Sequence, residues 1–349
     1  MSQTLKSFLL RHLVTWESFL AVLTLATLAY ASLSLDTFAT QFNISQAIAG
    51  VAERALVALP MVLLIIAREI DISVASILAL SSVIFGLAIQ ADWPLSLAIA
   101  AALLCGGLCG AFNGALVTLL GLPSLVVTLG TLAMFRGIGY ILLGSASVNI
   151  FPDSFTDFGI DGVFDSALPW TIVPFLVLAP IFAVVLQATP IGRRLYAIGG
   201  NPDAARYAGV RVERIRFSLF VVAGLMSALA GIVFTARLAN ARANNALGLE
   251  FDVITIALLG GVSVFGGRGK LTGVFWALVL VATLRNVLGL NQIGGDAQGV
   301  MIGLLLIVSL LASNIATSAL PALRRLFSSS RPGGPNSGDR PATSTTSPK

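Results

Sequence analysis

Charged residues are scarce in this chain of 349 residues. Asp, Glu, Lys and Arg make up 11% of it, whereas hydrophobic residues make up 56% and the mean hydropathy is +0.93. This composition excludes an ordinary soluble domain and indicates a chain that lies in membrane lipid. The net charge of +5 is small, and no stretch interleaves basic and aromatic residues, so we expect no nucleic-acid partner.

Residues that carry most enzyme chemistry are also rare. The chain has one histidine, His12, and two cysteines, Cys105 and Cys109, which lie in an apolar run without a nearby His or acid. We therefore interpret the cysteines as small packing residues rather than a disulfide or metal pair. A P-loop is missing too, because Val264 and Leu271 stand where the motif around Lys270 needs Gly and Ser or Thr. We expect no catalytic residue, no metal and no cofactor, and hence no enzyme.

What the chain does contain is a series of apolar runs, many of them near the ~20 residues that a helix needs to cross a bilayer. They predict an all-α, polytopic membrane protein of about ten transmembrane helices, with both termini on the same side. The predicted spans are 16–35, 44–67, 72–90, 95–120, 125–143, 170–187, 215–236, 251–264, 271–290 and 297–314.

The distribution of Lys and Arg predicts the orientation. If the N-terminus is cytoplasmic, 16 of the 21 Lys and Arg residues fall in inner segments, so we expect both termini to be cytoplasmic. The expected parts are a cytoplasmic N-terminus (1–15), a transmembrane domain (16–315) and a mostly disordered cytoplasmic tail (316–349). The outer segment 145–169 carries aspartates every four residues, which predicts an irregular acidic loop.

The longest polar stretch between two apolar runs is Pro190–Arg216, which carries six arginines. Inside it, Asn201 is a typical helix cap, Pro202 a typical first residue and Asp203 a favourable first-turn acid, while Gly209 is a typical stop. The pattern predicts a short cytoplasmic helix that docks another protein. An ordinary positively charged inner loop is the alternative.

Two short, interrupted apolar segments stand out in the two halves of the chain. The first ends at Arg68–Ser73, and the second leads into the glycine-rich loop 260–270. Such a pair is typical of a transport path near the bilayer midplane. In the span 95–120, Gly106, Gly110 and Gly114 form successive GxxxG steps, which predict close helix packing, with Asn113 beside them.

Several of these blocks resemble one transporter family. Asp203-Ala204-Ala205 followed by Gly209 resembles the EAA-x-x-x-G motif of ABC-importer permeases, with Asp in place of Glu and without the longer I-x-L-P ending. The blocks EIDISVASILAL, GAFNGALVTLLGLPSLVVTLGTLAMFRGI and IALLGGVSVFGGRGKLTGV resemble the ribose-type branch in the same order. Glu69 and Ala75 replace two glycines common there, a departure closer to rhamnose-type and autoinducer-2 permeases.

The resemblance implies partners and a location. Such permeases pair as homo- or heterodimers in the bacterial inner membrane, bind a cytoplasmic ATP-binding subunit and receive sugar from a periplasmic binding protein. It implies that loop 190–214 holds the coupling helix. The implied ATPase-coupling residues are Asn201, Pro202, Asp203, Ala204, Ala205, Arg206, Tyr207 and Gly209.

The resemblance also implies that Asp71 and Ser73 lie close to the path of the substrate. A dry path needs hydrogen-bond partners for sugar hydroxyls, and an aromatic ring can stack on the sugar. The path residues that we predict are Asp71, Ser73, Asn113, Ser124, Thr128 and Phe135.

We therefore expect the transmembrane permease subunit of an ATP-driven importer of rhamnose, ribose or a similar monosaccharide. The alternative is a proton-coupled secondary sugar transporter, in which Glu69, Asp71, Glu250 or Asp252 binds protons. An integral-membrane enzyme is disfavoured by the missing catalytic residues. Asp71 could also serve structure alone, paired with a neighbour such as Arg68.

Overall fold

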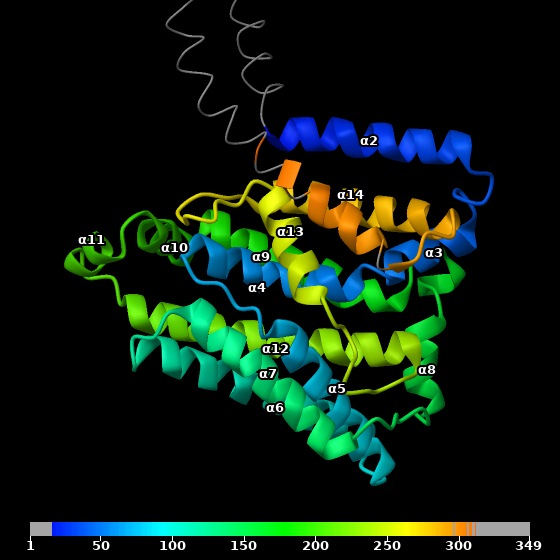
Figure 1. The fold of residues 1–349 in the computed structure, drawn as a ribbon, viewed down its shortest axis with the longest axis horizontal. Helices are drawn as coiled ribbons and strands as arrows, with labels where there is room; N and C mark the ends of the chain where they lie inside the picture. Colours follow the sequence, from blue (N-terminus) through cyan, green and yellow to red (C-terminus); the bar gives the residue numbers. More distant parts are fainter. Residues whose placement is uncertain (1–15, 296, 306, 309–310, 312–349) are drawn as a thin grey trace, which may run out of the picture. The chain divides into compact units, whose positions relative to one another are not determined.

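The computed structural model describes residues 16–295, 297–305, 307–308 and 311 (Figure 1). The described residues up to 305 form one compact unit, and the described residues 307, 308 and 311 belong to a second. The expectations for residues 1–15 and for the tail 316–349 therefore lie outside the described residues.

Helices account for all regular structure in the described part of the chain, as the long apolar runs predict. Strand-like pairing is limited there to two isolated bridges, Val148 with Ala241 and Gly162 with Pro169. The elements are α2 (Trp16–Ser34), α3 (Gln41–Ala49), α4 (Ala52–Ile66), α5 (Val74–Gln90), α6 (Leu95–Thr118), α7 (Ser124–Leu143), α8 (Asp153–Ile160), η1 (Val163–Asp165), η2 (Trp170–Ile172), α9 (Val173–Ala188), α10 (Pro190–Gly200), α11 (Pro202–Tyr207), α12 (Val212–Leu238), α13 (Leu249–Leu259) and α14 (Leu271–Leu290).

The described residues contain seven helical segments long and apolar enough to cross a membrane, so the polytopic class holds. They are 16–34, 41–66, 95–118, 124–143, 170–188, 212–238 and 271–290. Helix α5 is apolar but has only 17 residues. Two expected spans differ more: α13 is an 11-residue helix, and the run 297–314 extends beyond the described residues.

The segment 145–169 contains a helix that the aspartate spacing argues against. Helix α8 begins after Pro152, and Asp153 lies in its first turn, where a negative charge favours the helix. Two of the four aspartates, Asp161 and Asp165, come after its end, so like charges do not accumulate along it. Its Phe155 packs on Phe85 with ring centroids 4.7 Å apart. The expectation of an irregular loop is therefore wrong between 153 and 160.

Helix α12 runs between α4 and α6 in Figure 1 and packs against α4, α5 and α6. The predicted glycine steps on α6 lie directly against α12. A side chain on Gly106 would collide with the Gly224 carbonyl, and one on Gly110 with the Phe220 carbonyl. The predicted tight packing is confirmed, because small residues let helix backbones approach closely in lipid.

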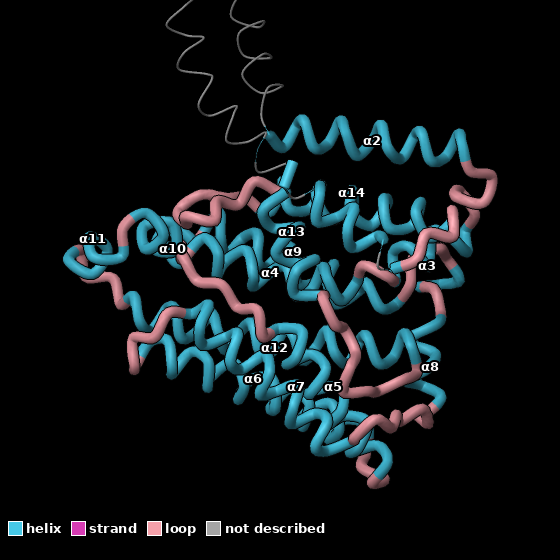
Figure 2. Tube along the Cα trace, viewed as in Figure 1, coloured by secondary structure: helices cyan, strands magenta, loops and turns pink. Residues whose placement is uncertain are grey.

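Helix α4 is the most enclosed element. Every residue of Ala52–Ile66 is buried except Arg54, as expected for a helix that is apolar on all sides. Beyond Ile66 the helix stops, and residues 67–73 run as an irregular segment to α5 (Figure 2). A second irregular segment, 260–270, separates α13 from α14. Both interruptions that the sequence indicates are therefore present.

Candidate functional site

Three of the predicted path residues form one buried hydrogen-bonded set at the first interruption. One carboxylate oxygen of Asp71, Oδ1, accepts hydrogen bonds from the backbone N–H of Ser73 (2.9 Å) and from its hydroxyl (2.6 Å). The Asn113 side-chain amide, on α6, donates to the Ser73 Oγ at 2.8 Å. All three residues are fully buried. The chain therefore brings a carboxylate, a hydroxyl and an amide together where a helix is broken.

Two further predicted residues hold the same segment from α7. The Ser124 Oγ accepts a hydrogen bond from the Ile70 backbone N–H, and the Thr128 hydroxyl donates to the Ile70 carbonyl, each at 3.3 Å. They satisfy backbone groups that the break in the helix would leave unpaired in a membrane interior. Both bonds are at the long, weak end of hydrogen-bond geometry.

Phe135 lies further along α7 and is separate from this polar set. Its ring is buried among Ile77, Leu80 and Cys109, with the ring of Phe112 edge-on at 6.4 Å. This environment is that of a packing residue. Cys109 lies in the same apolar cluster, as its interpretation as a packing residue predicts.

Two polar atoms of the set have no hydrogen-bond partner among the described residues. They are the second carboxylate oxygen of Asp71 and the amide oxygen of Asn113, both buried. Unsatisfied buried acceptors are uncommon in native structures and call for a physical explanation. Both can accept a hydrogen bond from a hydroxyl group.

The described residues show no ion pair between Arg68 and Asp71, so Arg68 is not the partner that a structural role of Asp71 would use. The Arg68 guanidinium donates instead to the carbonyl oxygens of Gly199 (2.7 Å) and Gly200 (2.8 Å) at the end of α10. The neighbouring Glu69 is bound by Arg216 of α12 at 2.9 Å. The two charged residues before Asp71 therefore connect the interruption to the polar stretch that includes α10 and α11.

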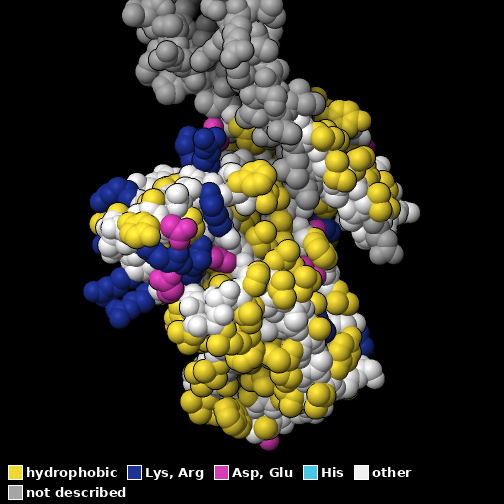
Figure 3. Space-filling model, turned by 60° about the vertical axis from the view of Figure 1, so that its left-hand side comes forward, with side chains coloured by type: hydrophobic (Ala, Val, Ile, Leu, Met, Phe, Trp, Pro, Cys, Tyr) yellow, Lys and Arg dark blue, Asp and Glu magenta, His cyan; other side chains and the backbone are white. Residues whose placement is uncertain are grey.

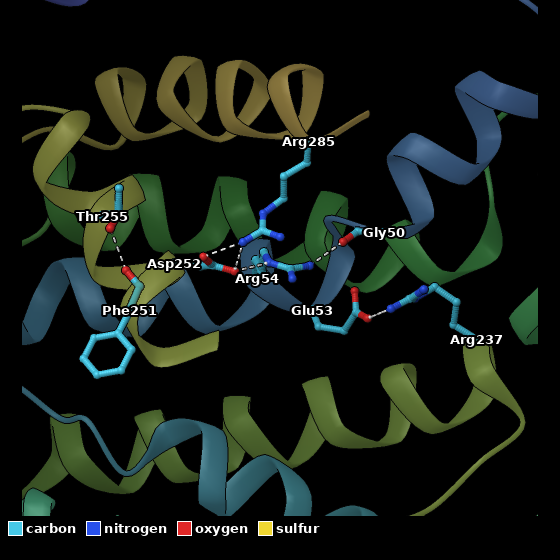
Figure 4. Close-up of polar contacts among 8 residues, drawn as sticks. All are labelled: Gly50, Glu53, Arg54, Arg237, Phe251, Asp252, Thr255 and Arg285. Carbon is cyan, nitrogen blue, oxygen red and sulfur yellow. Dashed lines mark hydrogen bonds and ion pairs between the residues drawn. The ribbon is translucent and has the colours of Figure 1, made fainter. Parts of the chain in front are cut away.

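A second group of charges, which the sequence analysis did not pair, ties four helices together (Figure 4). Glu53 of α4 is bound by Arg237 of α12, and Asp252 of α13 is bound by both Arg54 and Arg285, the latter two at 2.8 and 2.7 Å. Charges inside apolar spans are expected to pair with one another. Arginines within the apolar runs were the available signal, but the sequence does not show which acid each one meets.

The predicted coupling segment folds as its residues indicate. The Asn201 side-chain oxygen accepts the backbone N–H groups of Asp203 (3.0 Å) and Ala204 (3.1 Å), and Pro202 is the first residue of α11. Gly209 has φ = +81° and follows the cap residue Ala208, a left-handed position that favours glycine. Both the predicted cap and the predicted stop of this helix are confirmed.

Helix α11 presents its side chains outward at one end of the bundle. Tyr207 is 93% exposed, while Ala205 is buried beneath the helix. Arg206 pairs with Asp203 of the same helix at 2.7 Å. It also pairs with Glu213 at 2.6 Å, and this second contact joins α11 to the start of α12. Lys and Arg side chains gather around this end in Figure 3. Among the nearby exposed arginines are Arg193, Arg194, Arg211 and Arg214.

Within the part of the chain that the structure describes, no three His, Cys, Asp or Glu side chains gather closely enough to hold a metal ion. The site combines two features. The buried helix α4 ends in an interruption that contains the buried carboxylate of Asp71, and the short helix α11 is exposed, capped and flanked by arginines. Together with several apolar spans, these features define a membrane transport component.

Comparison with known proteins identifies the family. Residues 43–310 match the family described as the permease component of the branched-chain amino acid transport system, and the chain belongs to this family of transport components, which are not enzymes. It is 35% identical to the autoinducer 2 import system permease protein LsrD of Klebsiella pneumoniae, over 90% of this chain and 97% of that protein.

Two other relatives carry the names of sugars. The chain is 32% identical to the ribose import permease protein RbsC of Haemophilus influenzae, over 87% of this chain and 94% of that one. It is 34% identical to the L-arabinose transport system permease protein AraH of Escherichia coli, over 85% and 90%. No solved structure is significantly similar to the chain. The resemblance to ribose-type permeases is therefore confirmed.

Proposed function

We propose that this chain is the transmembrane permease subunit of an ATP-binding-cassette importer for a monosaccharide, such as rhamnose, ribose or a similar sugar. It forms the path for the sugar and couples to ATPase subunits, while ATP hydrolysis takes place on those partner chains. The near full-length similarity to permeases named for autoinducer 2, ribose and L-arabinose supports this function.

The observation that carries the sugar assignment is the buried polar set of Asp71, Ser73 and Asn113. Two of its acceptor oxygens are unsatisfied among the described residues, and a sugar presents hydroxyl donors. An unpaired hydroxyl in a dry path costs several kcal/mol, so such acceptors stabilise a polyol as it passes. Ser124 and Thr128 line the same interruption and are proposed to contact the sugar. Phe135 packs among apolar side chains of neighbouring helices, and its proposed role is to hold these helices beside the path.

Helix α11 is the proposed docking element for the ATP-binding subunit. A capped helix keeps one shape, and an exposed tyrosine flanked by arginines is the composition that protein interfaces favour. In this assignment the side chains of Asp203, Arg206 and Tyr207 face the ATPase. Asn201, Pro202, Ala204, Ala205 and Gly209 fix the shape that α11 presents.

The proposed arrangement in the membrane follows the charge distribution. Both termini and the α10–α11 end are cytoplasmic, and 145–169 is external, because Lys and Arg concentrate on the inner side of short loops. The chain then contributes about ten membrane helices, with α5 and α13 as shorter members. It works in the bacterial inner membrane as a homo- or heterodimer that receives sugar from a periplasmic binding protein.

Reconstitution tests this function. Vesicles containing the permease, its ATP-binding subunit and the binding protein are assayed for uptake across a panel of pentoses, hexoses, deoxyhexoses and autoinducer 2. We expect uptake of one sugar class that needs ATP inside and persists when an uncoupler removes the proton gradient. Uptake that continues without the ATPase and collapses with the proton gradient would instead establish the proton-coupled transporter.

A further inference from the structure

Three segments that are far apart in the sequence meet beside α11. They are the end of α4, the end of α10 and the glycine-rich loop 260–270. We call this meeting point the junction and define it by Ile66, Arg68, Tyr196, Gly199, Gly200, Gly266, Gly267 and Gly269.

Hydrogen bonds join all three segments in the junction. The Arg68 guanidinium donates to the carbonyls of Gly199 and Gly200 at 2.7 and 2.8 Å. The Gly267 backbone N–H donates to the Ile66 carbonyl at 2.9 Å. The Tyr196 hydroxyl donates to the Gly269 carbonyl at 2.7 Å. Each segment is therefore bound directly to at least one of the others.

The backbones in the junction approach one another as closely as glycine permits. A side chain on Gly199 would collide with the Ile66 carbonyl oxygen and with the Gly267 backbone nitrogen. Arg68 itself has φ = +65°, which is uncommon for a residue other than glycine. Residues in such conformations persist when their surroundings hold them there, and they concentrate at functional and switch regions. The two hydrogen bonds of its guanidinium stabilise this conformation of Arg68.

The junction lies between α11 and Asp71. Gly200 directly precedes Asn201, the cap of α11, and Arg68 lies three residues before Asp71. Among the described residues, α11 is also linked to the start of α12 by the Arg206–Glu213 ion pair, whose side chains are 43% and 48% exposed. Exposed ion pairs contribute little stabilisation. The connection between α11 and Asp71 with the fewest residues therefore runs through Gly200 and Arg68, beside a second route along α12 to the Arg216–Glu69 ion pair.

We propose that Arg68 is a positioning residue that transmits movement of α11 to the segment 67–73 and so to Asp71. This inference rests on the proposed function, since it assumes that α11 binds an ATPase. When α11 moves, the carbonyls of Gly199 and Gly200 move with it and displace the Arg68 guanidinium. The segment can follow because its hydrogen bonds to Ser124 and Thr128 are long.

The test uses variants that keep the backbone conformation of Arg68. Asn and Gly both adopt positive φ more readily than other residues, so Arg68→Asn and Arg68→Gly remove the guanidinium without forcing the chain to refold locally. Arg268→Gln is the matched control, because Arg268 is an exposed arginine of the loop 260–270 whose side chain makes no hydrogen bond or ion pair in the described structure.

The first readout is the number of ATP molecules hydrolysed per sugar transported by the complete complex in vesicles. Coupling free energies between sites correspond to about 5–150-fold effects, so we expect both Arg68 variants to raise this ratio at least about fivefold. They should accumulate normally and retain the ATPase on purification. Arg268→Gln should keep the ratio of the unmodified protein.

The second readout does not need a transported sugar. Hydrogen exchange of the backbone amides in 67–73 is followed with and without the bound ATPase. We expect ATPase binding to alter this exchange in the unmodified protein and in Arg268→Gln, but not in either Arg68 variant. An unchanged coupling ratio in the Arg68 variants would overturn the proposal, as would an exchange response that survives without the guanidinium. Failure of the unmodified complex to transport any sugar would instead refute the proposed function.

Discussion

The carboxylate of Glu53 in α4 is bound by the guanidinium of Arg237 in α12, with contacts of 2.9 and 2.5 Å. Glu53 is fully buried, and its second carboxylate oxygen has no other partner in the described structure. A buried charge without its counter-ion is strongly unfavourable, so this pair is expected to hold the enclosed helix α4 against α12.

Replacing Arg237 with Met should therefore destabilise the protein by about 3–5 kcal/mol, because Glu53 would be left charged and unpaired. Adding Glu53→Gln to the same chain should restore a large part of that loss. Thermal unfolding in detergent measures both variants. Arg242→Met is the control, since Arg242 is exposed and has no ion pair in the described structure. Equal losses in the single and double variants would contradict this role of the pair.

The contact between α6 and α12 gives a second stability prediction. Gly110→Ala should lower the unfolding temperature, because the new methyl group would collide with the Phe220 carbonyl, a backbone atom that cannot turn aside. Gly107→Ala should change it little, since its methyl would meet the flexible end of Leu225 at 3.2 Å. The same thermal measurement distinguishes the two. If Gly110→Ala left the unfolding temperature unchanged, α6 and α12 could move apart without a loss of stability, which would contradict this prediction.

Asp71→Asn should reduce uptake and change which sugars compete. The Asn side chain keeps an oxygen that can accept the two hydrogen bonds from Ser73, but it replaces the unsatisfied carboxylate oxygen with a donor. The membrane level and ATPase binding should therefore stay unchanged. Competition assays in reconstituted vesicles measure the specificity. A variant that fails to accumulate in the membrane would indicate that Asp71 serves structure.

The orientation is tested at Ser154, an exposed residue of α8. In a chain without Cys105 and Cys109, Ser154→Cys should react with an impermeant thiol reagent added outside intact cells, because 145–169 is expected to be external. Labelling that requires opening of the membrane would reverse the topology.

Features that depend on neighbouring residues were predictable from the sequence. The cap and stop of α11 involve residues within nine positions of each other, and the glycine steps of α6 repeat every four. The class, the family and the two interruptions follow from composition, motifs and the lengths of apolar runs. The polar residues Asp71, Ser73, Asn113, Ser124 and Thr128 do gather around the first interruption.

Features that join distant residues were not predictable. Glu53 and Arg237 are 184 positions apart, Arg54 and Asp252 are 198 apart, and Arg68 and Gly199 are 131 apart. The sequence marks these residues as charges in apolar surroundings, but their partners depend on how the helices pack. The predicted span 251–264 was wrong in its length, since α13 has 11 residues and an apolar run does not show where its helix ends.

The central claim, that α11 couples this permease to an ATPase, depends on the shape of a six-residue helix. Asn201→Ala removes the cap and should cost about 0.5–2 kcal/mol of local helix stability. Gly209→Val forces a β-branched residue into a left-handed position, although space for the side chain is open. Gly209→Asn is the matched control, because Asn tolerates that conformation.

The most direct test measures ATPase retention and sugar uptake for Gly209→Val beside Gly209→Asn and the unmodified protein. All three should insert into the membrane at equal levels. The account predicts that Gly209→Val loses the ATPase on purification, or keeps it without transport, while Gly209→Asn retains both. A Gly209→Val protein that holds its ATPase and transports normally would show that the segment is only a charged inner loop.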